Sequence, residues 1–182
     1  MLQIKSKERV KALAEVYTNE IEVVNMMNLI PIKENDDIIS CRYLEPSCGN
    51  GNFLIEIVRR KLNCLNIKFS EKSLNSYESN ICESIKTVYG VDICPENIQE
   101  AKNRLHEEIM LNFRQNKKQP SLGFKSSIRY ILDNNIITGD SINKPDLIKF
   151  IDCGIETNKF DVIITNPPYQ QSTNSHGAQA KP

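Results

Sequence analysis

The sequence predicts an α/β fold, a mostly parallel sheet with helices on both faces. Short runs rich in β-branched and aromatic residues recur along the chain, and segments with a helical spacing of apolar residues separate them. Most of these runs end in acidic, glycine-rich or proline-rich loops. The chain has 182 residues, of which 40% are hydrophobic, so it amounts to about one domain and can bury a core.

Four strands are expected, and polar loops follow them. The strands cover residues 38–44, 87–92, 136–140 and 160–165. Because parallel strands point the same way, their carboxyl ends meet at one edge, where open α/β sheets bind their ligands. The polar loops therefore predict a cofactor site at that edge.

The segments between the strands carry the apolar spacing of amphipathic helices. Helices are expected over residues 5–17, 20–30, 52–62 and 95–113, with a shorter one over 145–151. Pro95 favours a helix start, because proline is tolerated at a first helical position. Residues 66–84 are weakly patterned and are interpreted as an extra helix or an insertion, and residues 116–127 as a loop.

Composition excludes several classes of protein. No apolar run reaches the ~18 residues that span a bilayer, and the polar N-terminus is unlike a signal peptide, so a cytoplasmic protein without membrane contact is expected. The six cysteines form no C-x-x-C pair and there are only two histidines, so no metal site or redox pair is indicated.

The charge is balanced over the chain but uneven along it. Lys+Arg and Asp+Glu both number 23, which argues against a dedicated nucleic-acid-binding domain. Seven basic residues nevertheless lie between Lys102 and Arg129, against two glutamates. We interpret this segment as a solvated helix face and loop, with a phosphate-facing patch as the alternative. His106, beside the apolar stripe of its helix, is assigned a structural or surface role.

A tight glycine loop, Gly49-Asn50-Gly51, follows the first expected strand. It lets the backbone approach a ligand closely, next to the amides of a helix start. A dinucleotide fingerprint would need a third glycine where Leu54 stands, and an acid about 20 residues later, well before Asp92. A nicotinamide or flavin site is therefore disfavoured, and an ordinary tight turn stays an alternative.

Two acids, Asp92 and Asp140, each follow a short apolar strand. An ionised carboxylate only accepts hydrogen bonds, so at a strand tip it suits ribose hydroxyls or an adenine amino group. A helix cap or a turn is the structural alternative for either acid taken alone.

The segment Asn166-Pro167-Pro168-Tyr169 ends the fourth expected strand. Two prolines fix two φ angles and remove two backbone donors, which leaves a rigid turn that presents acceptors. The Asn166 side-chain oxygen and the Pro167 carbonyl suit an exocyclic amine, whose lone pair they would localise for methyl transfer. Tyr169 offers a flat face on which a base drawn out of a duplex can stack.

These motifs give the chain a resemblance to the γ-type N6-adenine DNA methyltransferases, close to the Eco57I-like group of restriction–modification and phage-defence systems. Residues 45–53 match the cofactor motif of that family, residues 90–93 resemble its ribose-binding motif, and residues 139–141 resemble the motif that contacts the cofactor's adenine. Residues 161–169 match its catalytic motif, and residues 7–27 resemble the segment that closes over the methionine moiety.

The resemblance implies a Rossmann-like class I methyltransferase fold that uses S-adenosylmethionine, and it implies no metal. The implied cofactor contacts are Thr18, Glu45, Pro46, Ser47, Gly49, Gly51, Phe53, Asp92, Ile93, Asp140, Ser141 and Asn166. The implied catalytic residues are Asn166, Pro167, Pro168 and Tyr169. Two departures from the family are Asn19, where proline is usual, and the long stretch between Glu45 and Asp92.

The same resemblance implies an N-terminal helical segment over 1–37 and a catalytic domain over 38–182. It implies double-stranded DNA as substrate, held through a target-recognition domain beyond this sequence, and a restriction endonuclease as partner or fusion. On this basis residues 1–182 are expected to bind the cofactor weakly and not to methylate DNA unaided. The alternatives are a methyltransferase acting on a glutamine amide or on RNA, and a non-catalytic subunit that retained the fold.

Overall fold

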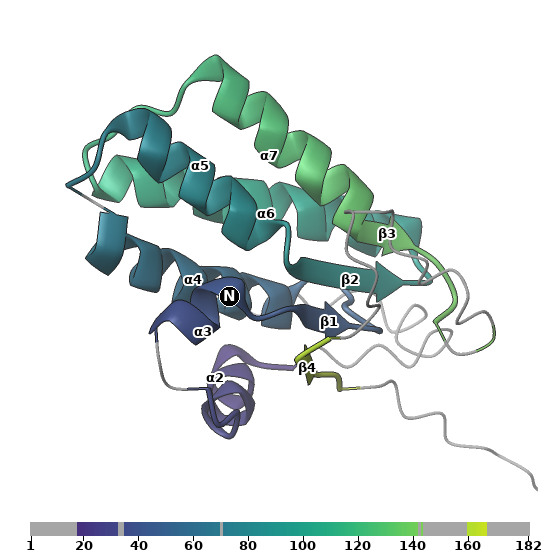
Figure 1. The fold of residues 1–182 in the computed structure, drawn as a ribbon. Coiled ribbons are helices and arrows are strands. Elements are labelled where there is room, and N and C mark those ends of the chain that lie inside the picture. The colour runs from purple at the N-terminus through teal and green to yellow at the C-terminus, as the bar shows by residue number, and fades with distance from the viewer. Residues whose placement is uncertain (1–17, 33–34, 70, 142, 144–159, 167–182) are drawn as a thin grey trace, which may run out of the picture. The chain divides into compact units, whose positions relative to one another are not determined.

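Four short parallel strands form one sheet, in the order β3-β2-β1-β4 (Figure 1). They are β1 (Tyr43–Glu45), β2 (Val88–Asp92), β3 (Ile136–Thr138) and β4 (Val162–Ile163). The structure is a computed structural model that describes residues 18–32, 35–69, 71–141, 143 and 160–166. From β1 the chain steps to β2 and β3 on one side, and β4 lies on the other side of β1. The order therefore reverses at β1, which makes the β1–β4 boundary the switch point where such sheets bind ligands.

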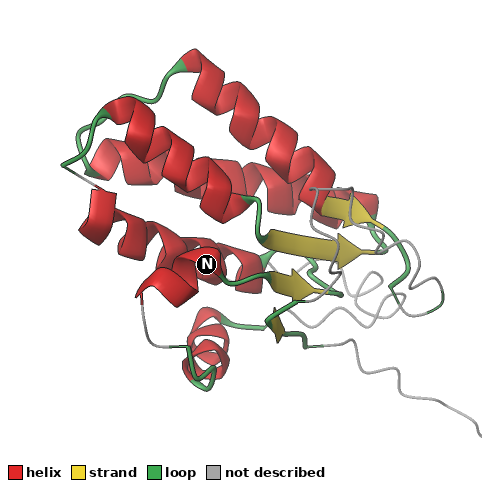
Figure 2. Ribbon diagram, in the orientation of Figure 1, coloured by secondary structure: helices red, strands yellow, loops and turns green. Residues whose placement is uncertain are grey.

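Six helices are described (Figure 2). They are α2 (Glu20–Asn28), α3 (Asn35–Ser40), α4 (Asn52–Phe69), α5 (Leu74–Ile85), α6 (Pro95–Gln115) and α7 (Leu122–Asn135). The expected helices over 5–17 and 145–151 lie outside the described residues. Among the described helices, none is both long and apolar enough to cross a membrane.

The helices gather on one face of the sheet. Tyr43, Val88 and Ile136 share a core with buried residues of α2 and of α4 to α7. Both crossovers, β1 to β2 and β2 to β3, step in the same direction, so a right-handed chain places their helices on the same face. The opposite face carries a smaller cluster of Leu44, Tyr89 and Val91, against which Ile137 and Phe160 pack. Helical cover is thus confirmed for one face, and the connection from β3 to β4 lies outside the described residues.

The prediction of a strand over 38–44 is wrong for its first half. Residues 35–40 form α3, and the strand begins only at Tyr43. Buried Lys61 of α4 accounts for this, because its ammonium donates to the carbonyls of Ile38, Ile39 and Cys41 and to the Thr87 hydroxyl, at 2.8–2.9 Å. These bonds satisfy carbonyls that a helix end leaves without partners, and no local pattern in the sequence reveals them.

Lys61 joins α4 to the segment before β1 and to Thr87 before β2 through buried hydrogen bonds. Its side chain is 0% exposed, and burial lowers its pKa to about 7, whereas the four oxygens around the ammonium favour the charged form. The predicted helix end near Leu62 is wrong for the same reason. Basic residues at 59–61 look like a C-terminal turn, but α4 continues to Phe69, because Arg60 and Lys61 bond to neighbouring segments.

The prediction of a loop over 116–127 is wrong from Leu122 onward, where α7 begins. Ser121 caps this helix, since its hydroxyl accepts from the Phe124 amide at 3.1 Å. The same hydroxyl and the Ser121 amide both donate to the carboxylate of Glu78 on α5, at 2.7 Å. The weakly patterned residues 66–84 likewise contain the helix α5, which confirms the extra-helix alternative.

Candidate functional site

The loop between β1 and α4 is shaped by two glycines with positive φ, 52° at Gly49 and 89° at Gly51. The Gly51 amide donates to the Cys48 carbonyl at 2.8 Å, and the Ile55 amide donates to the Gly51 carbonyl at 2.9 Å, which starts α4. The first amides of α4 have no acceptor within the helix, so they open onto the carboxyl edge of the sheet.

Gly51 also packs tightly against α6. A Cβ added at Gly51 would lie 3.0 Å from the Cβ of Ala101, and one added at Gly49 would meet nothing within 4 Å. Only glycine at 51 and a small residue at 101 let the loop and α6 approach this closely. This contact fixes how closely the loop lies against α6.

Asp92, at the end of β2, holds the loop in place. Its Oδ2 accepts from the Gly49 amide at 2.9 Å, and its Oδ1 accepts from the Cys94 amide at 2.9 Å. The Asn97 side chain lies at 3.4 Å from the same Oδ1. Each carboxylate oxygen can accept two hydrogen bonds, so Oδ2 keeps the capacity to accept one more, from a ligand's hydroxyl. Ile93 beside it is 63% exposed and offers an apolar surface next to that capacity.

Glu45 ends β1 as a buried acid, 2% exposed. Burial raises the pKa of Glu45 well above its usual range, the negative charge of Asp92 adds to this, and a hydrogen bond from the Leu54 backbone acts in the opposite direction. Its Oε2 is buried and has no hydrogen-bond partner among the residues that the structure describes. A buried oxygen in that state would gain from a donor or cation on a bound ligand.

The segment after β3 joins the same edge. The Ser141 hydroxyl donates to the Pro46 carbonyl at 2.6 Å, and the Gly139 amide donates to the Asp92 carbonyl at 2.9 Å. Both carboxylate oxygens of Asp140 accept from Asn143. The acid at the tip of β3 is therefore part of a local turn in this structure, and it lies one residue from the contact with the β1 loop.

The segment after β4 completes the edge. The hydroxyls of Thr165 and Ser47 are 2.5 Å apart, which ties the β4 end to the β1 loop. The Asn166 amide nitrogen donates to the Thr18 hydroxyl at 2.9 Å. Among the described residues none donates to the Asn166 oxygen. Pro167, Pro168 and Tyr169 lie outside the described residues.

Thr18 is fixed from a second side. Its backbone carbonyl accepts from the Asn52 side chain at 2.9 Å, and its own residue is 8% exposed. Asn52 in turn accepts from Arg104 of α6 at 2.8 Å, and the same guanidinium donates to the Asn50 carbonyl at 2.7 Å. The N-terminal contact position, the glycine loop and α6 therefore form one hydrogen-bonded unit.

Sequence reasoning missed Arg104, Asn52 and Asn97 as parts of this site. A signal was present on α6, because Asn97, Ala101 and Arg104 share one face of the helix by their spacing, and this face meets the loop. Phe53, predicted as a cofactor contact, lies in the hydrophobic core at 2% exposure. Its proposed contact stays a prediction, and its observed packing holds α4 against the sheet.

The arrangement suits a polar organic ligand. It offers an acceptor at Asp92, a buried carboxyl at Glu45, the N-terminal end of α4 and an apolar surface at Ile93. Asn166 lies across the loop, on the β4 side of the switch point. A donor group of a second molecule could be held there, beside the first.

Gly51→Ala is predicted to destabilise the protein more than Gly49→Ala. At Gly49 an added Cβ has space, so alanine costs only the left-handed backbone, about 1–2 kcal/mol. At Gly51 the wider φ of 89° and the contact with Ala101 add to that cost. Urea unfolding gives both free energies of unfolding.

Ala101→Gly supplies the control for this comparison. In combination with Gly51→Ala it removes the crowded Cβ, so the double variant should recover about 1 kcal/mol relative to the sum of the single costs. Strictly additive costs would show that the loop and α6 are not in the contact described.

Comparison with known proteins agrees with this geometry. Residues 86–181 match the family model of the Eco57I restriction-modification methylases. A search of curated proteins found no match for the chain. The matched segment begins before β2 and includes Asp92, Asp140 and the Asn166 segment, and it covers more than half of the chain. The chain therefore belongs to the Eco57I restriction-modification methylase family.

Proposed function

We propose that this chain forms the S-adenosylmethionine-binding and catalytic part of a DNA methyltransferase that acts on the N6 amino group of adenine. One observation carries the proposal: the loops after all four strands are joined by hydrogen bonds around Gly49 and Asn166 at one edge of the sheet. Family membership supports methyl transfer in a restriction–modification setting. The cofactor and the adenine N6 specificity rest on the residues at this edge.

The residues fit the cofactor in three respects. Asp92 keeps one acceptor position on Oδ2 for a ribose hydroxyl, and exposed Ile93 lies next to it for an adenine ring. The backbone at Gly49 and Gly51 leaves room for a close approach to the helix-start amides. Glu45 presents a buried oxygen without a partner, which a cationic or hydrogen-donating ligand would offset.

S-adenosylmethionine, when bound, supplies a methyl group on a cationic sulfur. The task of the chain is then to hold the accepting amine in line and to localise its lone pair. The Asn166 oxygen and the Pro167 carbonyl would accept the two hydrogens of an exocyclic amine. Tyr169 would stack against the base. After transfer the sulfur is neutral and the methylated nitrogen is cationic, and it releases one proton to solvent. No acid or base of shifted pKa is needed for this release, so the rate depends on orientation.

Thr18 acts on this step through Asn166. Its hydroxyl accepts from the Asn166 nitrogen, so the amide plane has one orientation and its oxygen is directed elsewhere. We therefore assign Thr18 as a positioning residue, with Asn52 holding its backbone. The predicted role of Thr18 in contacting the cofactor remains part of the proposal.

Asp92→Asn is predicted to weaken S-adenosylmethionine binding by tenfold or more. The substitution turns one acceptor toward the Gly49 or Cys94 amide into a donor, which disrupts the loop and removes the charge. Isothermal titration of residues 1–182 with the cofactor measures the change. Asp133→Asn is the matched control, because it makes the same change on α7, in an exposed side chain that pairs with Lys102.

Equal binding by wild type and Asp92→Asn would contradict the assigned cofactor site. Absence of binding by the wild-type chain at millimolar cofactor would contradict the cofactor itself.

Asn166→Ala is predicted to abolish methyl transfer while cofactor binding stays within a few fold. Expression of the intact gene in a host without adenine methylation should place N6-methyladenine at a defined sequence, and the variant should leave the DNA unmodified. Asn134→Ala is the control, because among the described residues this α7 side chain bonds only to the Tyr130 carbonyl of its own helix. Label that appears instead in RNA or in protein, or methylation that survives in Asn166→Ala, would contradict the proposal.

A further inference from the structure

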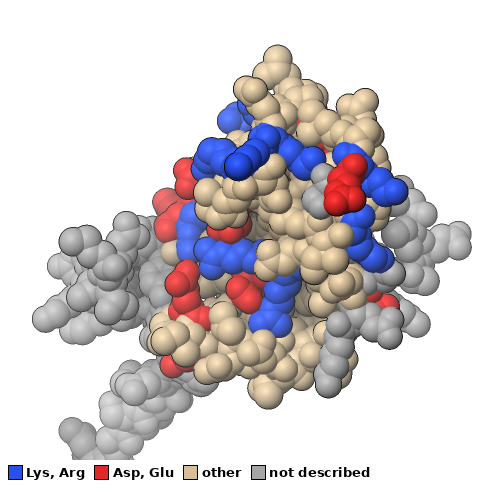
Figure 3. All heavy atoms as spheres, turned by 90° about the vertical axis from the view of Figure 1, so that its left-hand side faces the viewer, with Lys and Arg blue, Asp and Glu red and all other residues tan. Residues whose placement is uncertain are grey.

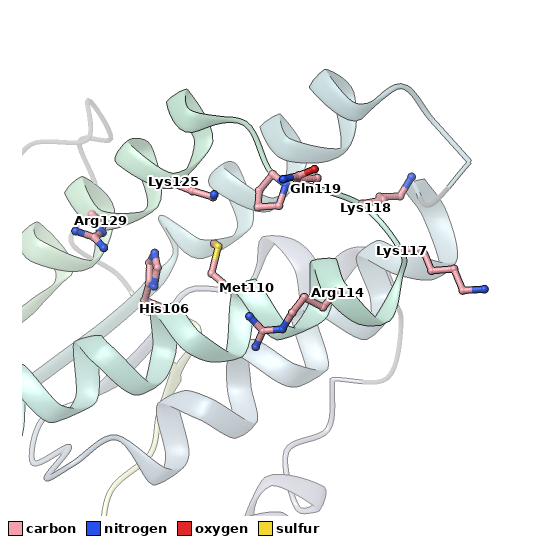
Figure 4. A pocket seen from close by; sticks show the side chains of 9 residues that line it. His106, Met110, Arg114, Lys117, Lys118, Gln119, Lys125 and Arg129 are labelled. Atoms are coloured by element: carbon pink, nitrogen blue, oxygen red, sulfur yellow. The ribbon is translucent and has the colours of Figure 1, made fainter.

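A basic hollow of about 670 Å³ lies between the second half of α6 and the first half of α7, with the turn that joins them (Figure 4). Its cationic lining residues are Arg114, Lys117, Lys118, Lys125 and Arg129, and no acidic side chain lines it. His106, Met110 and Arg114 follow each other at intervals of four along α6, and Lys125 and Arg129 do so along α7. Each helix therefore presents one stripe to the hollow.

The positive charges of this hollow are not compensated. None of its five cations forms an ion pair with a described residue. His106 adds a ring nitrogen, Nε2, that is buried and lacks a hydrogen-bond partner among the described residues. Burial, and then the positive charge of Arg129, lower the pKa of His106. The hollow is thus lined by five cations and by one buried ring nitrogen that has no partner among the described residues.

Helix dipoles explain only part of this pattern. Cations at the C-terminal end of α6 are favourable there, which accounts for Arg114. Lys125 lies in the first turns of α7, at the positive end of that helix, where a cation is unfavourable. Lys125 and Arg129 are also like charges at i and i+4, which repel each other on a helix. The α7 stripe therefore has a cost that the fold itself does not require.

The backbone of Lys117 is a second feature that is unfavourable for stability. It follows α6 with a φ of 53°, and it is the one described residue other than glycine with a positive φ. The Lys118 amide donates to the Phe113 carbonyl at 2.9 Å, which closes the helix in the manner that usually employs glycine at this position. A lysine stands where glycine would be less strained, and it places another cation at the rim of the hollow.

The hollow is separate from the carboxyl edge of the sheet. α6 begins three residues after Asp92 and runs away from that edge, so Arg114 lies about 28 Å further along the helix than Pro95. The β2–β3 crossover turns back only after this point. Figure 3, which views the molecule from the side opposite the strand tips, shows several Lys and Arg side chains on that end, with Asp and Glu side chains beside them.

We propose that this basic hollow binds the phosphate backbone of duplex DNA, as a second contact away from the base that is modified. The inference rests on the proposed function for its choice of DNA as the polyanion. The α6 stripe from His106 to Arg114 extends over about 12 Å, which is long enough to reach more than one phosphate of a strand. Arg and Lys on both flanks would neutralise these phosphates.

The lining fits a backbone better than bases. Met110 and Pro120 are its apolar members, and no phenylalanine, tyrosine or tryptophan lines it. Single-stranded nucleic acids are held largely by bases stacked on aromatic rings, which this hollow lacks. The Lys118 ammonium lies 5.3 Å from the centroid of the Tyr77 ring, but that ring is buried and is not part of the lining. Cations with no phenylalanine, tyrosine or tryptophan ring beside them in the lining fit contacts that carry no sequence information. The hollow would then add affinity and leave site choice to other parts of the enzyme.

The experiment measures binding of residues 1–182 to a labelled 20-base-pair duplex by fluorescence anisotropy, across a series of salt concentrations. Lys125→Gln/Arg129→Gln should weaken binding about tenfold at low salt and lower the slope of log K against log salt by about 1.8. Lys86→Gln is the control, because its ammonium already pairs with Glu83 on α5. The control should change affinity less than twofold.

Lys117→Gly provides a variant with opposite effects on stability and binding. Glycine relieves the positive φ, so the melting temperature should rise, while the lost cation should weaken DNA binding several-fold and lower the salt slope by about 0.9. A merely structural role for Lys117 would leave DNA binding unchanged or improved. That result would overturn the proposal.

Three further results would overturn it: an unchanged salt slope in the double variant, an equal loss in Lys86→Gln, or preferential binding of single-stranded RNA or polyglutamate over the duplex. Titration with S-adenosylmethionine on the same preparations separates the two proposals. Normal cofactor binding with an unchanged salt slope refutes only the hollow. Absent cofactor binding with the expected slope change refutes only the methyltransferase site.

Discussion

The hydrogen bond from the Gly49 amide to the Asp92 carboxylate fixes the β1 loop against the end of β2, and the rest of the site is built on it. Asp92 stands at the end of a strand, so its position follows from the sheet and not from the loop. The loop carries Ser47, whose hydroxyl contacts Thr165, and thus places the segment that follows β4. The carbonyl of Pro46, in the same loop, accepts a hydrogen bond from the Ser141 hydroxyl. One carboxylate therefore sets the mutual positions of three loops that are far apart in the sequence.

This construction suits methyl transfer, which depends on alignment more than on proton movement. The β1 loop and Asp92 lie on one side of the switch point, and Asn166 lies on the other, with Thr18 fixing its amide. A methyl donor and an amine held on these two sides would face each other across β1 and β4. Buried Glu45 beneath the loop adds a polar group whose burial is costly unless a ligand contributes a partner. Hydrogen bonds thus fix the position of Asn166, whereas the buried Glu45 oxygen has no hydrogen-bond partner among the described residues.

Much of this site could be predicted from the sequence, because its residues sit at strand ends and in tight turns with a local signature. Gly49, Asp92 and Asn166 were found from the strand–loop pattern, and the structure brings their loops together. Lys61 and Arg104 could not be found this way, since each bonds to backbone carbonyls that only the folded chain brings near. The prediction of a loop over 116–127 is wrong from Leu122 onward, although the Ser121 cap and the apolar stripe of α7 are local signals of a helix. The basic segment was interpreted as solvated surface, and its two helical stripes are visible only once α6 and α7 are paired.

The most direct measurement of the central claim is amide hydrogen exchange of residues 1–182, with and without S-adenosylmethionine. Bound cofactor should slow exchange in four separate segments, 45–55, 90–94, 139–141 and 164–166, because the hydrogen bonds around Asp92 and Ser47 join the loops that contain them. The α6–α7 turn near Lys117 should be unaffected and serves as the internal reference. Protection confined to one loop, or protection in the α6–α7 turn alone, would contradict a single cofactor site at the carboxyl edge of the sheet.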